Sequence, residues 1–529
     1  MLPGRHGLLA LILICCLSAS CKKDSIEEVP EAANRVTLLA SSVTLPRGGS
    51  ACIQFRASGL PDGFSVSLRL RDGGAPQSFS VTGVSKEAGT DVYAASVSDN
   101  GDSPFYSQEV CIEVIDGNGA RCSSTSDFIC VNCGAAVFPS TVDTGIPVVY
   151  INTEGHRPID SRGIELQSTL SISGSGIYED LQPCICSVRG RGNSSWNWDK
   201  KPLKISLRDR ISPLGMPDGS NWVMLANFVD RTLMRNLVAM KVSSLTSLAW
   251  TPHCVPVELV LNGSHVGNYL LIEQVEVDRN RVDISRDEGF LLELDFHYDN
   301  EKQWLDPHLT SLIIAGTPFA VRYPLPDSLD AARETYIKDY ISRTADTIYS
   351  KGFADPDTGY GKWIDIDSFI DYWIVNETLG NLDISSPGSV FLYKDGDGKL
   401  FAGPCWDYDW CLTEYATLVQ EWTGAVNSYA FWYSRLFKDA EFIRRVKLRV
   451  AELMPGLQEV AGYIDDCGSL LAASAELNFA MWNPGVDRWR NKGLLINGDE
   501  NMPFPEAVAK LRDVYVRRLS LLEKYSKTE

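Results

Sequence analysis

The sequence of 529 residues predicts an α+β fold, in which a small all-β sandwich precedes a larger domain of strands and helices. Three observations lead to this prediction. Apolar and polar residues alternate in residues 35–136, strand-like and helical segments mix after Pro139, and beyond about Ile366 the apolar residues recur at helical spacing. We therefore expect a sandwich over residues 35–136 and an α+β domain over residues 137–525.

The β-sandwich is predicted from short strands with turns between them. Phe64, Val66, Leu68 and Leu70 alternate with polar residues, which is the spacing of a half-buried strand. A second strand, 110–115, runs into Asp-Gly-Asn-Gly, a hairpin signal. About 100 residues of this pattern favour an immunoglobulin-like module. It carries no cluster of catalytic residue types, so we expect a spacer or adhesion module.

The larger domain is predicted from mixed periodicities. Strand-like segments 255–261 and 269–272 flank the turn residues Asn-Gly-Ser, and residues 391–401 read as a hairpin. Farther along, Phe369, Trp373 and Glu377 lie four residues apart, and residues 437–453 have helical spacing. We expect the C-terminal half to be mostly helical.

The charge balance excludes some partners. With 49 basic and 68 acidic residues, the net charge is 49 − 68 = −19. A surface of this sign repels nucleic acid and an anionic membrane, so neither is expected as the main partner. A site for a phosphate group must then depend on a few local cations and on bound metal.

The N-terminus resembles the leader of a bacterial lipoprotein. Residues 1–20 have a short apolar stretch after Arg5, and small residues precede Cys21, which would carry the lipid. Ser18 departs from the usual aliphatic residue of that motif. Polar residues 21–34 read as a flexible tether. We expect an outer-membrane lipoprotein of the bacterial cell envelope, exposed at the surface and held in the membrane only through Cys21.

The cysteine pattern indicates disulfides or core cysteines rather than zinc sites. Of 14 cysteines, three lie in the leader, which leaves 11, an odd number in a compartment that permits disulfides. We expect some disulfides and at least one free thiol. The pairs Cys130/Cys133 and Cys184/Cys186 lack a second ligand pair nearby, so disulfides or core cysteines are favoured over zinc sites.

A glycine-rich basic segment is the first candidate for a phosphate site. Residues 189–196 read Arg-Gly-Arg-Gly-Asn-Ser-Ser-Trp, and residues 200–205 read Lys-Lys-Pro-Leu-Lys-Ile. Glycines let backbone N–H groups approach a phosphate, and Arg and Lys supply charge. A solvated hairpin has the same composition, and the segment is not a Walker A motif.

Two acidic segments are the other candidates. Asp383 follows a predicted helix, where a carboxylate can accept the proton of a hydroxyl group. Asp407 and Asp409 are two residues apart on what reads as an extended segment, so both could face one hard cation such as Mg²⁺. A turn residue at 383 and two solvated edge acids at 407 and 409 are the structural alternatives.

These segments, in this order, resemble the CotH kinase family. The resemblance covers about three quarters of the chain and rests on six stretches: Arg191-Gly-Asn-Ser-Ser with the following Lys-Lys-Pro-Leu-Lys, Trp222–Asn227, Gly267–Glu273, Leu291–Asp295, Gly380–Asp383 and Pro404–Asp409. It implies an atypical protein-kinase-like domain of two lobes, with ATP and Mg²⁺ or Mn²⁺ between a β-rich and a helical lobe.

The resemblance also implies a role for each matching residue. Lys201 would hold the α- and β-phosphates, with Lys204 as the competing choice and Glu273 as the ion-pair partner. Asp383 would be the catalytic base, and Asp407 the metal ligand with Asp409 as a second. The phosphates and the adenine would be lined by Arg191, Asn193, Ser194 and Trp406. No Asn follows Asp383 at short distance, which leaves one or two metals open.

The implied activity is transfer of phosphate from ATP to hydroxyl groups of exported or cell-surface proteins, the chain itself included. Phosphoryl transfer needs mainly positioning and charge neutralisation, which a base, a metal-binding acid and a lysine provide. Two other readings stay open at this stage. One is a kinase-like surface binding or adhesion protein without turnover, and the other is a glycoside hydrolase that uses two of the aspartates.

Overall fold

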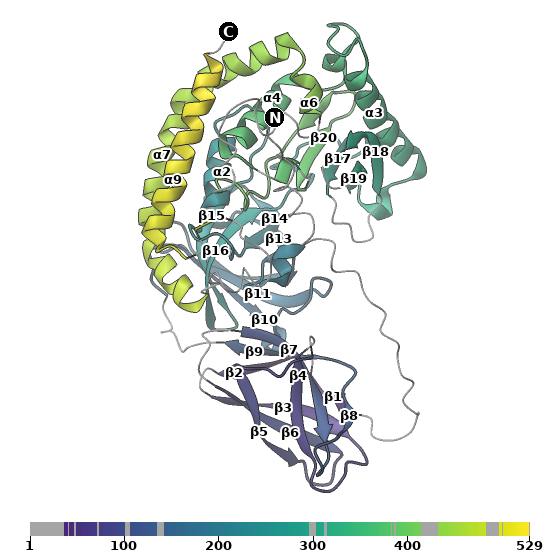
Figure 1. Ribbon diagram of the computed structural model, residues 1–529, viewed down its shortest axis with the longest axis vertical. Helices are drawn as coiled ribbons and strands as arrows, with labels where there is room; N and C mark the ends of the chain where they lie inside the picture. The colour runs from purple at the N-terminus through teal and green to yellow at the C-terminus, as the bar shows by residue number, and fades with distance from the viewer. Residues whose placement is uncertain are drawn as a thin grey trace, which may run out of the picture.

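The computed structural model contains both helices and several sheets, which confirms the predicted α+β class. From the purple strands at the bottom of Figure 1, the chain passes into a barrel and then into helices at the top. The structure describes residues 36–40, 42–46, 49–70, 73–100, 106–134, 142–295, 303–310, 315–381, 383–385, 388–413, 432–482, 497–499 and 501–527. The leader, Cys21 and the tether therefore lie outside the described residues.

Residues 36–134 form two sheets that share one hydrophobic core. In β4, Val66 and Leu68 are buried, as the predicted alternation requires. One sheet has the order β1-β3-β6-β5, and the other has the order β2-β9-β7-β4 with β8 on β7. The strands are β1 (Val36–Leu38), β2 (Ser42–Pro46), β3 (Ser50–Ala57), β4 (Ser65–Leu70), β5 (Phe79–Lys86), β6 (Val92–Asp99), β7 (Tyr106–Ile115), β8 (Arg121–Ser124) and β9 (Ile129–Gly134).

Seven strands then close into a barrel in the order β10-β11-β12-β13-β14-β16-β15. The predicted hairpin is present: Asn262 and Gly263 both have positive φ, as a tight two-residue turn requires. Barrel closure has no signal in the sequence. The strands are β10 (Val148–Thr153), β11 (Leu166–Ser173), β12 (Leu181–Gly190), β13 (Leu203–Ile211), β14 (Gly219–Leu225), β15 (Cys254–Leu261) and β16 (Ser264–Glu273).

A second sheet and the helices enclose the largest core. The sheet has the order β18-β19-β17-β20-β21, and its last two strands form the predicted hairpin. Its strands are β17 (Phe290–Leu294), β18 (Gln303–Thr310), β19 (Ala315–Tyr323), β20 (Val390–Lys394) and β21 (Leu400–Ala402). The helices are α2 (Arg235–Ser243), α3 (Ala331–Tyr349), α4 (Ile366–Leu379), α6 (Tyr433–Leu436), α7 (Ala440–Met481) and α9 (Phe504–Ser526).

Helix α7 is much longer than the predicted segment 437–453, with 42 residues. It packs along α9 and also against the barrel strand β16, as Figure 1 shows. Apolar residues at helical spacing continue through the whole of α7, past Pro455. The helix therefore links the barrel to the helical part of the chain.

A buried lysine lies where α7 meets the barrel. The Lys200 ammonium donates to the Asn268 carbonyl and, at 2.8 Å, to the Asn478 side chain of α7. It also lies 4.4 Å from the centre of the Tyr269 ring. Burial lowers the pKa of Lys200 to about 7.

This burial predicts a pH-dependent contribution to stability. Between about pH 7 and pH 10, the unfolded chain keeps the Lys200 proton and the folded chain releases it, so the contribution of Lys200 to stability rises with pH. We expect the free energy of unfolding of the native protein, minus that of Lys200→Met, to rise from pH 7 to pH 9 in urea titrations. Lys399→Met, at an exposed position, is the control. A pH-independent difference for Lys200→Met would contradict the assignment.

The cysteines that the structure describes are free thiols. Nine cysteines are unpaired thiols, including Cys184 and Cys186, so a disulfide between those two is wrong. The side chains of Cys130 and Cys133 lie outside the described residues.

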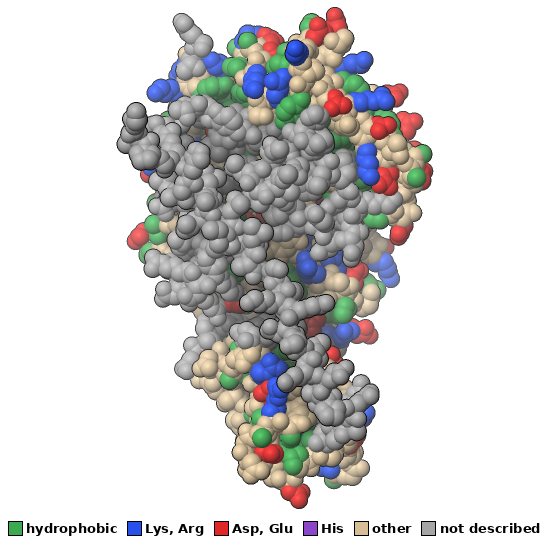
Figure 2. All heavy atoms as spheres, turned by 45° about the vertical axis from the view of Figure 1, so that its right-hand side comes forward, with side chains coloured by type: hydrophobic (Ala, Val, Ile, Leu, Met, Phe, Trp, Pro, Cys, Tyr) green, Lys and Arg blue, Asp and Glu red, His purple; other side chains and the backbone are tan. Residues whose placement is uncertain are grey.

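On the face in Figure 2, described acidic and basic side chains are interspersed rather than gathered by sign. Within the described ranges, no helix combines the length and the apolar character needed to cross a bilayer.

Candidate active site

The segment that carries Asp383 starts at the end of α4. Gly380 ends this helix with φ of 58°, a conformation that suits glycine. The Asn381 side chain donates to the Asn376 side chain at 3.0 Å and accepts the Asp383 N–H at 3.2 Å. Two buried amide side chains thus fix the backbone at the half-buried Asp383.

The end of α4 is also held by α9. The guanidinium of Arg518 donates to the backbone carbonyls of Glu377 and Thr378 and to the Glu377 carboxylate. A cation at a helix C-terminus satisfies the carbonyls that lack partners within the helix. The position of Asp383 therefore depends on packing between α4 and α9.

Asp407 and Asp409 lie in a turn, not on an extended segment. Strand β21 ends at Ala402, and Asp407 has φ of 62°. The expectation that strand alternation brings the two acids together is therefore wrong, because a left-handed residue reverses the chain there. The backbone N–H of Asp409 instead hydrogen-bonds the Asp407 carboxylate, which also accepts the Ser389 hydroxyl at 3.4 Å.

The three carboxylates influence one another electrostatically. Burial first, and then the charges of Asp407 and Asp409, raise the pKa of Asp383 well above its usual range. Burial also raises the pKa of Asp407, and burial together with Asp407 raises the pKa of Asp409 to about 7. Acids that destabilise each other's charge in this way form a site that favours a cation.

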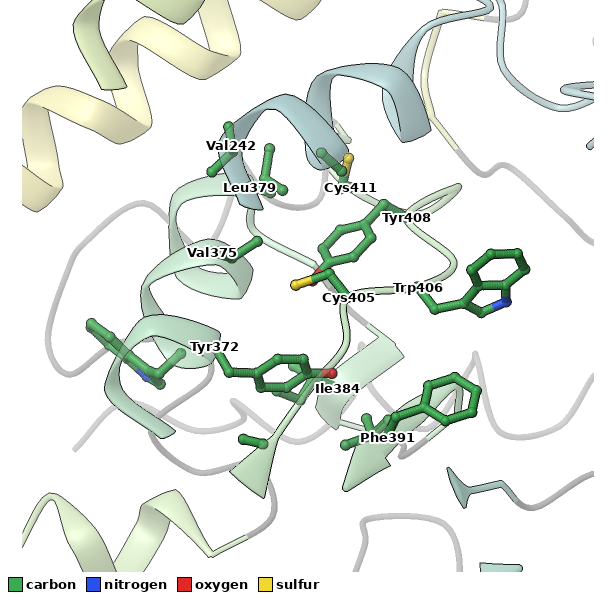
Figure 3. Close-up of a cluster of buried hydrophobic side chains, with 14 of the residues drawn as sticks. Val242, Tyr372, Val375, Leu379, Ile384, Phe391, Cys405, Trp406, Tyr408 and Cys411 are labelled. Atoms are coloured by element: carbon green, nitrogen blue, oxygen red, sulfur yellow. The ribbon is translucent and has the colours of Figure 1, made fainter. Parts of the chain in front are cut away.

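The side chains between these acids anchor the turn. Figure 3 shows Tyr408 directed toward Cys405 and the α4 side chain Val375, whereas Trp406 leaves the turn on the other side. Tyr408 is fully buried, and Trp406 is nearly so. The apolar residues around the acids therefore belong to the core, and they hold the turn in place.

Helix α2 supplies a second anchor. The buried Asn236 side chain accepts the Tyr408 N–H at 2.8 Å and donates to the Asp409 carboxylate. Its neighbour Arg235 donates to the Cys411 carbonyl at 3.0 Å. Two consecutive residues of α2 therefore hold both ends of the acidic turn.

Arg235 is the centre of a buried ionic network. Its guanidinium pairs with Asp230 and, at 2.7 Å, with Asp499, and all three side chains are almost completely buried. Asp230 also accepts the backbone N–H of Arg235 and the Thr232 hydroxyl. The network joins the start of α2 to the segment before α9.

The barrel side of the site is basic. Arg191 follows β12, and its guanidinium lies 5.4 Å from the centre of the Trp406 ring. The charge of Arg191 lowers the pKa of Asp407, and Arg191 in turn feels the charges of Glu293 and Asp409. Arg191 therefore lies at the acids, and Trp406 packs against this arginine.

The register of the barrel strands determines the direction in which the Lys204 side chain points. Lys204 on β13 pairs with Val223, which pairs with Ile272, so the three side chains point to one face of the barrel. Val223 and Ile272 belong to the core shared with the helices, whereas the next residue, Ile205, points into the barrel. Lys204 therefore faces the helical part of the chain.

Lys201 lies just before β13 and contacts a different segment. Its ammonium donates to the Trp196 carbonyl at 2.8 Å and lies 5.2 Å from the centre of the Trp196 ring. The neighbouring predicted residues Asn193 and Ser194 are exposed. The structure thus places Lys201 at the turn of residues 194–197, whereas Lys204 lies on the barrel face toward the helices.

The predicted ion pair of Glu273 with a lysine is absent from the described residues. Glu273 is fully buried and accepts the His253 backbone N–H and ring Nδ1, both at 2.8 Å. The acids near Lys204 are Glu165 and Glu276. Burial raises the pKa of Glu276, and the charges of Arg281 and Lys204 oppose that rise. Glu273 pairs with Trp222, whose side chain lies in the core of the barrel, so Glu273 faces the barrel interior. Lys204 pairs with Val223 and faces the opposite side of the barrel wall.

The acids suit a magnesium or manganese ion that also binds a nucleotide. In the described ranges, no three His, Cys, Asp or Glu side chains converge in a geometry that could hold a metal alone. Mg²⁺ usually binds through one or two carboxylates together with substrate phosphates. Asp407 and Asp409 provide these hard oxygen ligands, and burial raises the pKa of both carboxyl groups although Arg191 and Arg235 oppose that rise.

Sequence reasoning missed several residues that shape the site. Asp230, Arg235 and Asn236 come just after the matched stretch Trp222–Asn227, and Glu276 comes just after Gly267–Glu273. A usable signal was present at the first position, since Asp230 lies five residues before the arginine that begins α2. Asp499 carries no such signal, because its partner is 264 residues away.

Comparison with known proteins agrees with this arrangement. The family model described as CotH kinase protein matches residues 188–519, which is 332 of 529 residues. The match begins on β12 and ends in α9, so it includes every acid and cation of the site. No curated protein matches the chain. Because the family model covers more than half of the sequence, the chain belongs to the CotH kinase family.

Proposed function

We propose that this chain is an ATP- and divalent-metal-dependent phosphotransferase of the protein kinase type. The observation that carries the proposal is the grouping of three mutually repelling carboxylates, Asp383, Asp407 and Asp409, with the barrel cation Arg191, whose charge in turn reaches Lys204. Membership of the CotH kinase family supports a kinase-like function in general.

Each residue has a role that its environment supports. Asp383, with its raised pKa, would accept the proton of the acceptor hydroxyl, since a base works best when its pKa is close to the working pH. Asp407 and Asp409 would hold Mg²⁺ or Mn²⁺, which neutralises charge on phosphate oxygens when bound. Arg191 and Lys204 would contact the phosphates from the barrel side.

The fold fits a two-lobed reading. The barrel with Arg191 and Lys204 would form the β-rich lobe, and the part with α4, α7 and α9 would form the helical lobe. Residues 36–134, with two sheets around one core, fit the immunoglobulin-like module. We further propose residues 1–20 as signal peptide, residues 21–34 as tether and a lipid on Cys21, which would place the domain 137–525 at the outer surface of a bacterial envelope.

The proposed acceptor is a protein of the same compartment, including this chain. A direct test is incubation of the purified chain with γ-labelled ATP and either Mg²⁺ or Mn²⁺. We expect label on the chain or on added envelope protein, and no label when EDTA is present. Absence of both labelling and ATP binding would end the proposal.

Calorimetry separates this function from a binding protein without turnover. The kinase reading predicts heat on titration of ATP in the presence of Mg²⁺ or Mn²⁺, with little heat in their absence. A pure adhesion protein with a kinase-like fold gives no metal-dependent heat. Absence of metal-dependent heat would support the binding protein without turnover.

Exchanging the two candidate lysines tests the register argument. Lys204→Met removes a cation at the phosphate side, and we expect a loss of about 10²-fold in phosphate transfer, as for removal of one electrostatic contact in other active sites. Lys201→Met is the matched control, because this ammonium is bound to the Trp196 carbonyl. Rates with saturating Mg²⁺ and varied ATP measure both variants. A larger loss of phosphate transfer for Lys201→Met than for Lys204→Met would instead favour Lys201 as the lysine that holds the α- and β-phosphates.

A further inference from the structure

We infer that Asn236 of α2 is a positioning residue that orients Asp409 for metal binding. This inference rests on the proposed function, because it treats Asp409 as a metal ligand. Neither the family resemblance nor the sequence motifs assigned a role to Asn236.

The contacts of Asn236 carry the inference. Its amide nitrogen donates to Asp409 Oδ1, and its amide oxygen accepts the Tyr408 N–H at 2.8 Å. One side chain therefore binds the carboxylate and the backbone next to it. With Oδ1 engaged, Oδ2 has no hydrogen-bond partner among the described residues, and it is the oxygen left for a cation.

Asn236 is itself held rigidly. It is 2% exposed and is the second residue of α2. The residue before it, Arg235, is fixed by Asp230 and Asp499 and donates to the Cys411 carbonyl. A carboxylate bound to such a support keeps one orientation, which is the condition for a preorganised metal ligand.

A purely structural role would give a different pattern of effects. If Asn236 only held the turn together, its loss would weaken metal binding through every ligand of the turn, Asp407 included. If Asn236 acts through the orientation of Asp409, its loss would have no further effect once the Asp409 carboxylate is gone. A double-mutant cycle distinguishes the two cases.

The experiment measures Mn²⁺ binding by the full chain with electron paramagnetic resonance of free Mn²⁺. Asn236→Leu keeps the size of the side chain and removes both hydrogen bonds, and we expect Mn²⁺ affinity to fall about 10- to 100-fold, as for other residues that support a metal ligand. Asn236→Ala, which adds no bulk, provides the same measurement if the leucine variant fails to fold.

The matched control is Asn280→Leu. Asn280 likewise donates its amide to an aspartate, Asp218, but near the distant end of β14. We expect this variant to bind Mn²⁺ as the native chain does. Asp409→Asn and the double variant Asp409→Asn with Asn236→Leu complete the cycle.

The outcomes are distinguishable. Equal Mn²⁺ affinity of Asp409→Asn and the double variant supports the inference. The inference is overturned if Asn236→Leu lowers Mn²⁺ affinity in the Asp409→Asn background as much as it does in the native chain. It is also overturned if both Asn236 variants bind Mn²⁺ with native affinity. Either result leaves the proposed function in place. Absence of Mn²⁺ binding by the native chain, with and without ATP, overturns the inference together with the proposed function.

Discussion

Replacing Asp407 with asparagine is expected to reduce ATP-dependent phosphate incorporation by about 10³-fold, since a metal ligand supports several kcal/mol of charge stabilisation in the transition state. Asparagine is the suitable substitute at this position. Asp407 has φ of 62°, a conformation that asparagine tolerates and alanine does not. The variant thus removes the charge without straining the turn, and initial rates with labelled ATP and Mn²⁺ measure the effect.

Asp397→Asn is the matched control for Asp407→Asn. Asp397 is an exposed acid in the turn between β20 and β21, within the same segment of the chain. We expect native rates from this control. The assignment of Asp407 would be untenable if both variants transferred phosphate at the native rate.

Replacing Arg235 with leucine is expected to destabilise the protein by about 3–5 kcal/mol, the usual result when one partner of a buried ion pair is removed. Asp230 and Asp499 would then be buried without their cation, and the Cys411 carbonyl would lose its donor. Urea unfolding followed by tryptophan fluorescence should show a midpoint lower by about 1 M or more.

The exposed pair Arg444 and Glu441 provides the control for Arg235→Leu. Their side chains are more than half exposed, and such pairs contribute little to stability. Arg444→Leu should therefore unfold at the native midpoint. If Arg235→Leu also unfolded there, the buried network would not be a source of stability.

Local patterns in the sequence predicted the local structure well. The alternation in residues 64–70, the hairpin at Asn262 and the helical spacing of Phe369, Trp373 and Glu377 each depend on neighbouring residues. The structure has a strand, a hairpin and the helix α4 at these places. The α+β class followed from these elements. Closure of the barrel depends on β10 pairing with β15, more than 100 residues away, and no local pattern encodes it.

The site was predicted in part for the same reason. Asp383, Asp407, Asp409 and Arg191 were found because their motifs are contiguous, and the structure brings them together. The choice between Lys201 and Lys204 was open because it depends on strand register, which a shift of one residue reverses. Asn236 was missed because its role appears only when α2 is placed beside the acidic turn.

The end of α4 has a consequence for movement between the two parts of the chain. Asp383 follows this helix directly, and the Leu412 N–H, just beyond the acidic turn, bonds to the Leu379 carbonyl at 2.8 Å. Asp383 and the segment with Asp407 and Asp409 are therefore both attached to one helix terminus. Under the proposed function, a hinge motion between the two lobes would leave the spacing of the three acids unchanged and alter their separation from Arg191.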